Sequence, residues 1–344
     1  MKNNNYISIA RIEDTDELMQ FIDNEWKKNH ILGIDKDYFL YEYGNKKLLN
    51  FVISKNKNNM INGMLGFLRS STDQNTTVWT TMWKVSESAR SPMLGICLLN
   101  YLREQGYKSV MSSGINQETE EIYKYLGFEV GILKQYFILN KKIEQYRIAV
   151  LPDNISDKSL SPSKDESLVF KQIELNDIKE NFNFNDYLNR IPYKDFAYFT
   201  KRFFEHPIYS YNVYGIFHGS SLLSFIVIRI INSQKSTCMR IVDFYGKENT
   251  LATLAWHLSE IMYLNRHEYI DMYSLGLSEK IILRSGFIEI DNNTSDIIIP
   301  NYFEPFDQSN VSIRYFTDAS ELVNLRIYKA DGDQDRPSFI NNED

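Results

Sequence analysis

The sequence has 344 residues, of which 43% are hydrophobic, so it can bury a sizeable core, and its length favours two domains over one. Its formal net charge of −7 gives no overall basic field of the kind that draws a protein to nucleic acid or to an anionic membrane. The two cysteines, Cys97 and Cys238, stand far apart without a CxxC motif, which disfavours a disulfide framework and a zinc site. We therefore expect small-molecule partners, no metal, no nucleic acid and no membrane.

The N-terminal stretch MKNNNYISIARIEDTDEL lacks the apolar core of a signal peptide. The most apolar later stretch, SLLSFIVIRII, is too short to span a bilayer. These features and the scarcity of cysteine predict a cytoplasmic protein. The sequence does not decide between a monomer and a homodimer.

In chain order, the first half is predicted to begin with a strand at YISIARI and an acidic-capped helix at DTDELMQFIDNEWKKNHIL. A hairpin over residues 48–70 and a strand at TTVWTTMWKV follow. A helix around MLGICLLNYLREQ, a strand at YKSVMSSG and a short helix ending at Gly127-Phe128 complete the predicted elements before a closing strand. This order is typical of one α+β unit.

A stretch rich in Ser, Asp, Lys and Pro, PDNISDKSLSPSKDES, has the composition of a linker. After it the same order of elements returns, from LVFKQI through a hairpin, the strand STCMRIVDFYG, the helix TLATLAWHLSEIM and a second Gly-Phe turn. We interpret this as an internal duplication. The predicted organisation is a first domain over residues 1–150, a linker over 151–167, a second domain over 168–305 and a tail over 306–344.

The stretch SARSPMLGICLLN places a glycine, Gly95, inside a predicted amphipathic helix, where glycine costs about 1 kcal/mol relative to alanine. A strand, a tight loop and a helix N-terminus together can bind a phosphate, because the first-turn N–H groups lack partners within the helix. Gly95 would let that phosphate approach, and Arg90 would add a charge-assisted contact. The alternative is a close packing contact at Gly95.

A second element, NQETEEIYKYLGF, has Asn116 at a predicted N-cap and a terminating turn at Gly127-Phe128. The spacing of Tyr123 puts its hydroxyl on one side of a short helix, from which it can donate a proton to a departing thiolate. The alternative is a tyrosine at the edge of the core, since the chain has 23 tyrosines.

These two segments resemble the acyl-CoA pyrophosphate loop and the Asn…Tyr…Gly-Phe element of the GNAT superfamily, with Met93 in place of the usual first glycine. The resemblance covers residues 6–140 by motif and 168–305 by the order of elements. It implies an α+β fold of two tandem GNAT-type domains, each a mixed, mostly antiparallel sheet flanked by helices. It also implies acyl-CoA as co-substrate, bound by Lys84, Val85, Arg90, Met93, Leu94, Gly95, Ile96, Asn116 and Tyr123.

Among tandem GNAT chains, the segments NEWKKNHIL, RIVDFYG, NYFEPF and RIYKADGDQDRPS look like those of nucleotide-sugar N-acyltransferases of bacterial O-antigen and capsule pathways. The resemblance implies transfer of an acetyl or 3-hydroxybutanoyl group to the amine of a dTDP-linked 3-amino-3,6-dideoxyhexose. The expected catalytic residues are His30 as base, with Asp243 and His206 as alternatives, and Tyr123 as acid. The residues expected to bind the acceptor are Trp26, His30, His206, Tyr245, Tyr302, Asp333 and Arg336.

The second repeat lacks the loop motif and carries Glu248 near its helix start, where it would repel a pyrophosphate, so we expect it to bind the acceptor and not CoA. In the tail, Asp331, Asp333 and Asp335 alternate as in a calcium loop, but Arg336 and Asn342 stand at the positions of the required glycine and glutamate. The tail is either disordered or folds back to contact the substrate. Two other functions stay open: a Fem-like aminoacyl transferase acting on a cell-wall precursor, and a non-catalytic protein that binds CoA or sugar.

Overall fold

The computed structural model describes residues 6–89, 91, 93–152, 161–291 and 296–339, and it divides into two compact units. Unit 1 consists of Met1–Val130, Tyr315–Ser320 and Gly332–Asp344. Unit 2 consists of Gly131–Arg314 and Glu321–Asp331. The C-terminal part of the chain therefore contributes to both units.

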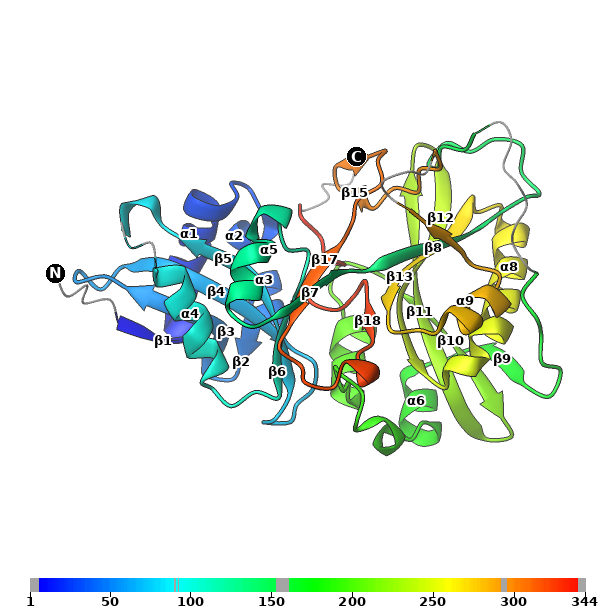
Figure 1. The fold of residues 1–344 in the computed structure, drawn as a ribbon, viewed down its shortest axis with the longest axis horizontal. Coiled ribbons are helices and arrows are strands. Elements are labelled where there is room, and N and C mark those ends of the chain that lie inside the picture. The colour runs from blue at the N-terminus through cyan, green and yellow to red at the C-terminus, as the bar shows by residue number, and fades with distance from the viewer. Residues whose placement is uncertain (1–5, 90, 92, 153–160, 292–295, 340–344) are drawn as a thin grey trace. The chain divides into compact units, whose positions relative to one another are not determined.

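Unit 1 is built on a mixed sheet in the order β1-β3-β4-β5-β6-β17-β7, with β2 paired to β3 (Figure 1). Its strands are β1 (Tyr6–Arg11), β2 (Gly44–Asn45), β3 (Leu48–Lys55), β4 (Ile61–Arg69), β5 (Thr77–Val85), β6 (Ser109–Ser113), β7 (Glu129–Ile132) and β17 (Arg314–Thr317). The pair β5–β6 is parallel, and β1, β3, β4 and β5 pair antiparallel in that order.

Helices cover both faces of this sheet. On one face lie α1 (Thr15–Phe21), α2 (Ile31–Ile34) and α3 (Lys36–Tyr43), and on the other α4 (Leu94–Arg103) and α5 (Glu120–Tyr125). Leu98, Leu99 and Leu102 form the apolar face predicted for α4 and are fully buried against the sheet. Gly106 and Gly127 have φ of 79° and 86° just past α4 and α5, which is where glycine favours helix termination.

Unit 2 repeats this plan, with a sheet in the order β9-β10-β11-β12-β13-β8-β14 and β18 paired to β13. Its strands are β8 (Lys134–Leu139), β9 (Val169–Gln172), β10 (Asn212–His218), β11 (Ser221–Ser233), β12 (Ser236–Gly246), β13 (Tyr269–Leu275), β14 (Ile288–Ile290) and β18 (Ile327–Tyr328), and β15 (Tyr302–Phe303) and β16 (Phe306–Asp307) form a separate pair. Its helices are α6 (Leu175–Asn181), α7 (Phe196–Phe199), α8 (Leu251–Asn265) and α9 (Glu279–Arg284). In both units a π-helical turn, Ile22–Trp26 and Thr200–Phe204, follows the early helix, and the predicted duplication is visible in this match.

The boundaries of the units differ from the boundaries expected from composition, because each sheet takes one strand from a distant part of the sequence. Strand β8 lies within the expected first domain but pairs with β13 and β14 of unit 2. In unit 1 the corresponding place, between β6 and β7, is held by β17 from the expected tail. Such long-range pairings leave no signal in the local sequence, since the residue pattern of a strand is the same whichever sheet it joins.

The central parallel strands of unit 2 separate after a short pairing, and the chain itself fills the gap. Strands β12 and β13 pair from Met239 to Ile241 against Ile270 to Met272. Beyond that point β18 pairs with Ser274 and Leu275, and the Ala330 amide donates to the Val242 carbonyl at 2.9 Å. Residues 327–330, called the β18 plug below, therefore satisfy backbone groups on both separated strands.

A buried charge cluster holds the end of the β18 plug. The Lys194 Nζ lies 2.7 Å from Asp243 and 2.9 Å from Asp331, and all three side chains are fully buried. Asp331 also accepts a hydrogen bond from the Tyr328 amide at 2.8 Å. One ammonium thus serves two carboxylates, and burial, only partly offset by Lys194, raises the pKa of Asp331 to about 6.

The raised pKa of Asp331 predicts a pH dependence of stability. Between about pH 3.8 and pH 6 Asp331 keeps a proton in the folded chain that it has lost in the unfolded chain, so the contribution of Asp331 to the free energy of unfolding falls as the pH rises through this window. Asp331→Asn cannot ionise, and we expect urea unfolding of this variant to lack that fall. The difference between the two curves should reach at most about 3 kcal/mol. Parallel curves for the two proteins would contradict the assignment.

Candidate active site

The candidate site of unit 1 begins where its two central strands separate. Strands β5 and β6 pair in parallel from Thr77–Ser109 to Thr80–Ser112, and β5 then continues to Val85. Among the strands that the structure describes, none pairs with this side of β5 after Thr80. Residues 81–85 are called the open edge of β5 below. Their backbone groups on that side are available to a ligand with an extended amide chain.

A bulge lies at the start of the open edge of β5. On the other side of β5, Leu65 pairs with Trp83 and Phe67 with Thr80, so that Thr81 and Met82 stand opposite the single residue Gly66. A Cβ on Gly66 would lie 2.6 Å from the Thr81 hydroxyl, so the bulge requires glycine there. Beyond the bulge, Trp83 packs toward the α4 side of the sheet.

The helix start predicted to hold a phosphate is formed by α4, which begins at Leu94 with Met93 as its N-cap. Met93 is 57% exposed and makes no side-chain cap hydrogen bond, Leu94 is buried, and Ile96 is half-buried. The amides of Gly95 and Ile96 belong to the first turn, whose N–H groups lack partners inside a helix. Arg90, which was expected to add a charge-assisted contact at this loop, lies outside the described residues, as does Pro92.

Gly95 faces an aromatic ring. A Cβ built on Gly95 would lie 3.1 Å from Nε1 and 3.3 Å from Cζ2 of the half-buried Trp83. The close packing contact left open in the sequence is therefore present. The same ring centroid lies 6.0 Å from that of Tyr123, so Trp83 stands between the start of α4 and the short helix α5.

The Asn…Tyr…Gly-Phe element folds as expected. The Asn116 side chain accepts a hydrogen bond from the Glu118 amide at 3.1 Å and caps the turn that leads into α5. Tyr123 is 6% exposed and packs on Phe316 of β17 with ring centroids 4.3 Å apart. Burial raises the pKa of Tyr123 to about 12, so its phenol is protonated at neutral pH and is a weaker acid than an exposed tyrosine.

His30 serves as the N-cap of α2. Its Nδ1 accepts a hydrogen bond from the Leu32 amide at 3.2 Å, and its ring meets the Trp26 ring edge-on with centroids 4.9 Å apart. The side chain is 1% exposed, and burial together with the nearby charges of Arg336 and Lys27 lowers the pKa of His30 to about 3. An imidazole with so low a pKa is a weak base at neutral pH.

The C-terminal segment, residues 332–339, packs within unit 1 and is ordered. Its Arg336 guanidinium forms an ion pair with Asp333 at 3.1 Å and lies 5.6 Å from the Trp26 ring centroid. The Ser338 carbonyl accepts a hydrogen bond from the Ile31 amide at 3.1 Å. Four residues expected at the acceptor site, Trp26, His30, Asp333 and Arg336, are thus brought together at α2.

Two polar side chains beside the open edge of β5 were not singled out from the sequence. The Glu25 carboxylate accepts a hydrogen bond from the Ser86 hydroxyl at 3.1 Å, directly after β5 ends. Glu25 belongs to the π-helical turn Ile22–Trp26, whose extra residue per turn cannot be read from periodicity. In the sequence, the one indication that Glu25 could lie at the site was its position next to Trp26.

Two candidate residues of unit 2, Asp243 and Tyr245, lie close together, because Lys194 contacts both. Asp243 and Tyr245 are fully buried, Asp243 in the charge cluster and Tyr245 in an aromatic core with Phe182 and Phe199. His206 is half-buried, and its Nδ1 accepts hydrogen bonds from the Ile208 and Tyr209 amides. Tyr302, in β15, is 46% exposed. Burial excludes Tyr245 from stacking on a ligand in this conformation.

No protein-family model and no curated protein matches this sequence. Solved structures do match it along most of its length. A GCN5-related N-acetyltransferase from Anabaena variabilis is 11% identical with a TM-score of 0.57, over 91% of this chain and 72% of that one. The fold is a tandem GNAT fold. A probable N-acyltransferase from Enterococcus faecalis (9% identity, TM-score 0.57, 90% and 72% of the two chains) and a GCN5-related N-acetyltransferase from Kribbella flavida (9%, 0.53, 91% and 70%) share it.

The described residues offer a limited set of chemical groups. They contain no group of three or more His, Cys, Asp and Glu side chains placed to hold a metal ion. In the same part of the chain, every helix is too short or too polar to cross a membrane.

The lowered pKa of His30 is testable by NMR. We expect its imidazole signals to keep the neutral-ring chemical shift from pH 8 down to about pH 5. Because the unfolded chain binds this proton near pH 6.5 and the folded chain only near pH 3, the contribution of His30 to the free energy of unfolding should fall as the pH is lowered below 6.5. His30→Asn, which preserves an N-cap, should lose that fall. A His30 titration near pH 6.5 would restore it as a candidate base.

The contact between Gly95 and Trp83 is testable by a double-mutant cycle in thermal unfolding. Gly95→Ala should destabilise the protein, because the new methyl group meets the indole ring. In a Trp83→Ala background the same change should instead stabilise it by up to about 1 kcal/mol, the helix preference of alanine over glycine. Equal effects in both backgrounds would mean that Trp83 does not determine the need for glycine.

Proposed function

We propose that this protein is an acyl-CoA-dependent N-acyltransferase whose acceptor is the amine of a nucleotide-linked amino sugar. The assignment of acyl-CoA as the donor is supported by the open edge of β5, which begins at a bulge and leads toward the start of α4. The tandem GNAT fold agrees with it. The acceptor class depends on the sequence resemblance and on the polar groups around Arg336.

The open edge of β5 suits the pantetheine arm of CoA. That arm is an extended chain with two amide groups, which can pair with a strand edge as another strand would. The diphosphate of CoA would then reach the first-turn amides of α4, Gly95 and Ile96 among them, at the positive end of the helix dipole. Lys84 and Val85, at the end of β5, would contact the arm through their backbone.

The reaction is a direct transfer in which the neutral amine nitrogen attacks the thioester carbon. The bond from carbon to nitrogen forms, the bond from carbon to sulfur breaks, and the products are an amide and the CoA thiol. Tyr123 donates a proton to the leaving sulfur, and Glu25 accepts a proton from the amine, the role first expected of His30. Backbone N–H groups of the open edge of β5 stabilise the oxyanion that develops on the carbonyl oxygen.

The surroundings of Arg336 favour an oxygen-rich acceptor. Its side chain is 8% exposed, and its Nη1 has no hydrogen-bond partner among the described residues. A guanidinium donor suits hydroxyl and phosphate oxygens, of which a nucleotide sugar has many. Trp26 supplies an adjacent aromatic face.

Unit 2 is proposed not to bind CoA, for a reason other than the one the sequence suggested. Glu248 is ion-paired with Arg326, so its charge is compensated. The gap between β12 and β13, which corresponds to the open edge of β5, is filled by the β18 plug. A pantetheine arm would have to displace this segment and break into the buried cluster at Lys194.

One observation favours a second candidate, a GNAT-fold protein that binds no CoA and catalyses nothing. The Trp83 ring occupies the space above Gly95 and lies next to Tyr123. This position of the ring narrows the approach to the first turn of α4. Calorimetric titration with CoA distinguishes the two candidates, because the acyltransferase must bind it.

The proposal is tested by mass spectrometry of products from a panel of amino-sugar nucleotides and acyl-CoAs. We expect one acylated sugar nucleotide. Tyr123→Phe should reduce kcat by about 10²- to 10⁴-fold, while Tyr125→Phe on the exposed face of the same helix leaves kcat unchanged. Arg336→Met should raise KM for the acceptor without changing CoA affinity. CoA binding without acylation of any sugar amine would overturn the acceptor class alone.

A further inference from the structure

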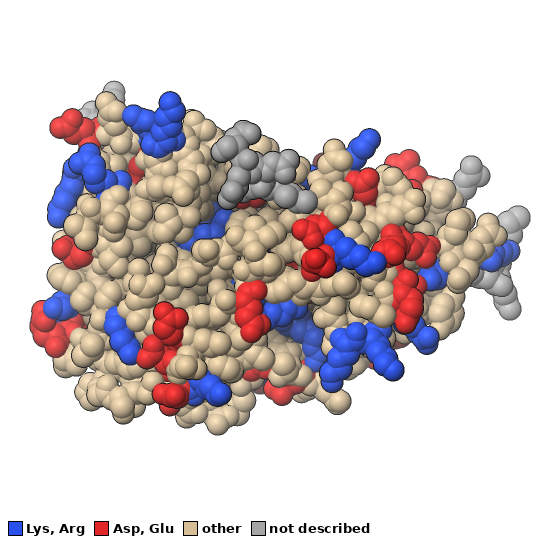
Figure 2. All heavy atoms as spheres, turned by 180° about the vertical axis from the view of Figure 1, so that it is seen from behind, with Lys and Arg blue, Asp and Glu red and all other residues tan. Residues whose placement is uncertain are grey.

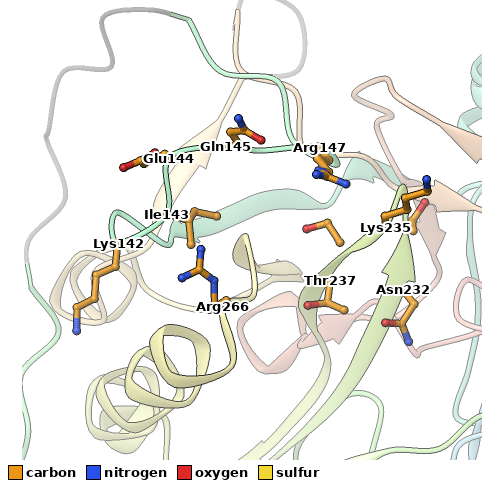
Figure 3. Close-up of a pocket in the computed structure, with 11 residues that line it drawn as sticks. Lys142, Ile143, Glu144, Gln145, Arg147, Asn232, Lys235, Thr237 and Arg266 are labelled. Atoms are coloured by element: carbon orange, nitrogen blue, oxygen red, sulfur yellow. The ribbon is translucent and has the colours of Figure 1, made fainter.

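Unit 2 contains a basic hollow that takes no part in the proposed transfer. It measures about 1010 Å³, within the range of small-molecule sites. It lies between residues 142–147, the β11–β12 hairpin and the C-terminal end of α8 (Figure 3). Four of its eleven lining residues are cations, Lys142, Arg147, Lys235 and Arg266, and one is an anion, Glu144.

The concentration of positive charge here contrasts with the rest of the chain, whose formal net charge is −7. On the face drawn in Figure 2, basic and acidic side chains are intermingled. In the hollow, by contrast, none of the four cations forms an ion pair with a carboxylate of the described residues. Figure 3 shows the Glu144 carboxylate directed away from Arg147 and Arg266.

The walls of the hollow are fixed by a buried polar network. The fully buried Glu268 carboxylate accepts hydrogen bonds from the backbone amides of Arg147, Ile148 and Ala149 at 2.7, 2.9 and 3.0 Å. The fully buried Asn140 donates to the His267 carbonyl at 2.8 Å and accepts from the Lys142 amide at 3.0 Å. The site is thus held in place before any ligand arrives.

Two of the cations occupy backbone positions that ordinarily favour glycine or asparagine. Arg266 ends α8 with a φ of 57°, and Lys235 sits in the β11–β12 turn with a φ of 58°. A side chain in this left-handed region costs stability relative to glycine. From the end of α8 the Arg266 side chain extends toward the 142–147 segment, as Figure 3 shows.

We propose that this hollow binds an anion with more than one phosphate group. Arg147 and Arg266 each present a planar fork of donors suited to phosphate oxygens, and Lys235 adds charge at the border, whereas the Lys142 ammonium lies 4.1 Å from the Tyr263 ring centroid. The hydroxyls of Ser236 and Thr237 supply neutral donors. The lining contains Ile143 but no aromatic residue, so recognition is directed at phosphates and not at a stacked base.

The test is a calorimetric titration of the full chain with inorganic diphosphate. It is done at about 50 mM salt, where exposed charges are incompletely screened. We expect binding that weakens as salt is raised. The double variant Arg147→Glu/Arg266→Glu should lose affinity by about tenfold or more. The matched double variant Lys179→Glu/Lys280→Glu makes the same charge change at exposed sites outside the hollow and should bind as the unmodified protein does.

A phosphate site and a purely structural role of Arg266 predict different results for a further variant. Arg266→Gly should weaken diphosphate binding while Tm stays the same or rises, because glycine relieves the left-handed position. A fall in Tm with unchanged binding would assign Arg266 a structural role and overturn the proposal. Absence of diphosphate binding, equal losses in both double variants, or binding confined to phosphatidylserine vesicles would overturn it as well. None of these outcomes depends on acyl transfer in unit 1.

Discussion

The architecture depends on one constraint, the need of every buried backbone group for a hydrogen-bond partner. In each sheet the two central parallel strands pair for only a few residues and then separate, which exposes strand edges in the middle of the sheet. Unit 2 meets the constraint with its own chain, because the β18 plug bonds to both separated strands. In unit 1 the open edge of β5 has no partner strand among the described residues, and there a ligand can satisfy it. The gap between the central strands is thus filled by the chain itself in unit 2 and forms a candidate site in unit 1.

The C-terminal region connects these two outcomes within a few residues. The segment before Asp331 fills the gap in unit 2 and is held by the buried Lys194, whose charge two carboxylates share. The residues after it pack in unit 1, where Asp333 and Arg336 lie beside Trp26. A region that in sequence resembles a solvated acidic tail is therefore structural on one side of Asp331 and lines a candidate site on the other.

Local sequence signals predicted the elements of the fold well. The apolar spacing of α4, the cap at Asn116 and the glycines after α4 and α5 each depend on neighbours within a few residues, and all are present as expected. The repeat of elements also emerged, and in each half the π-helical turn ends on an aromatic residue, with a histidine a few residues later. The sequence did not predict the pairings between distant segments, because β8 and β17 join sheets far from their sequence neighbours. The residues around the site divide in the same way, since Trp26 and Arg336 were anticipated whereas Glu25 and Trp83 were not.

By itself, then, the sequence determined the kind of unit and its duplication, because hydrophobic period, caps and turn residues act over short distances. Tertiary structure alone decided what each candidate residue can do. Burial made His30 a weak base and placed Tyr245 in the core, and a neighbouring ring gave Gly95 a packing role. Charge and exposure depend on which distant side chains surround a group, and only the folded chain brings those side chains together.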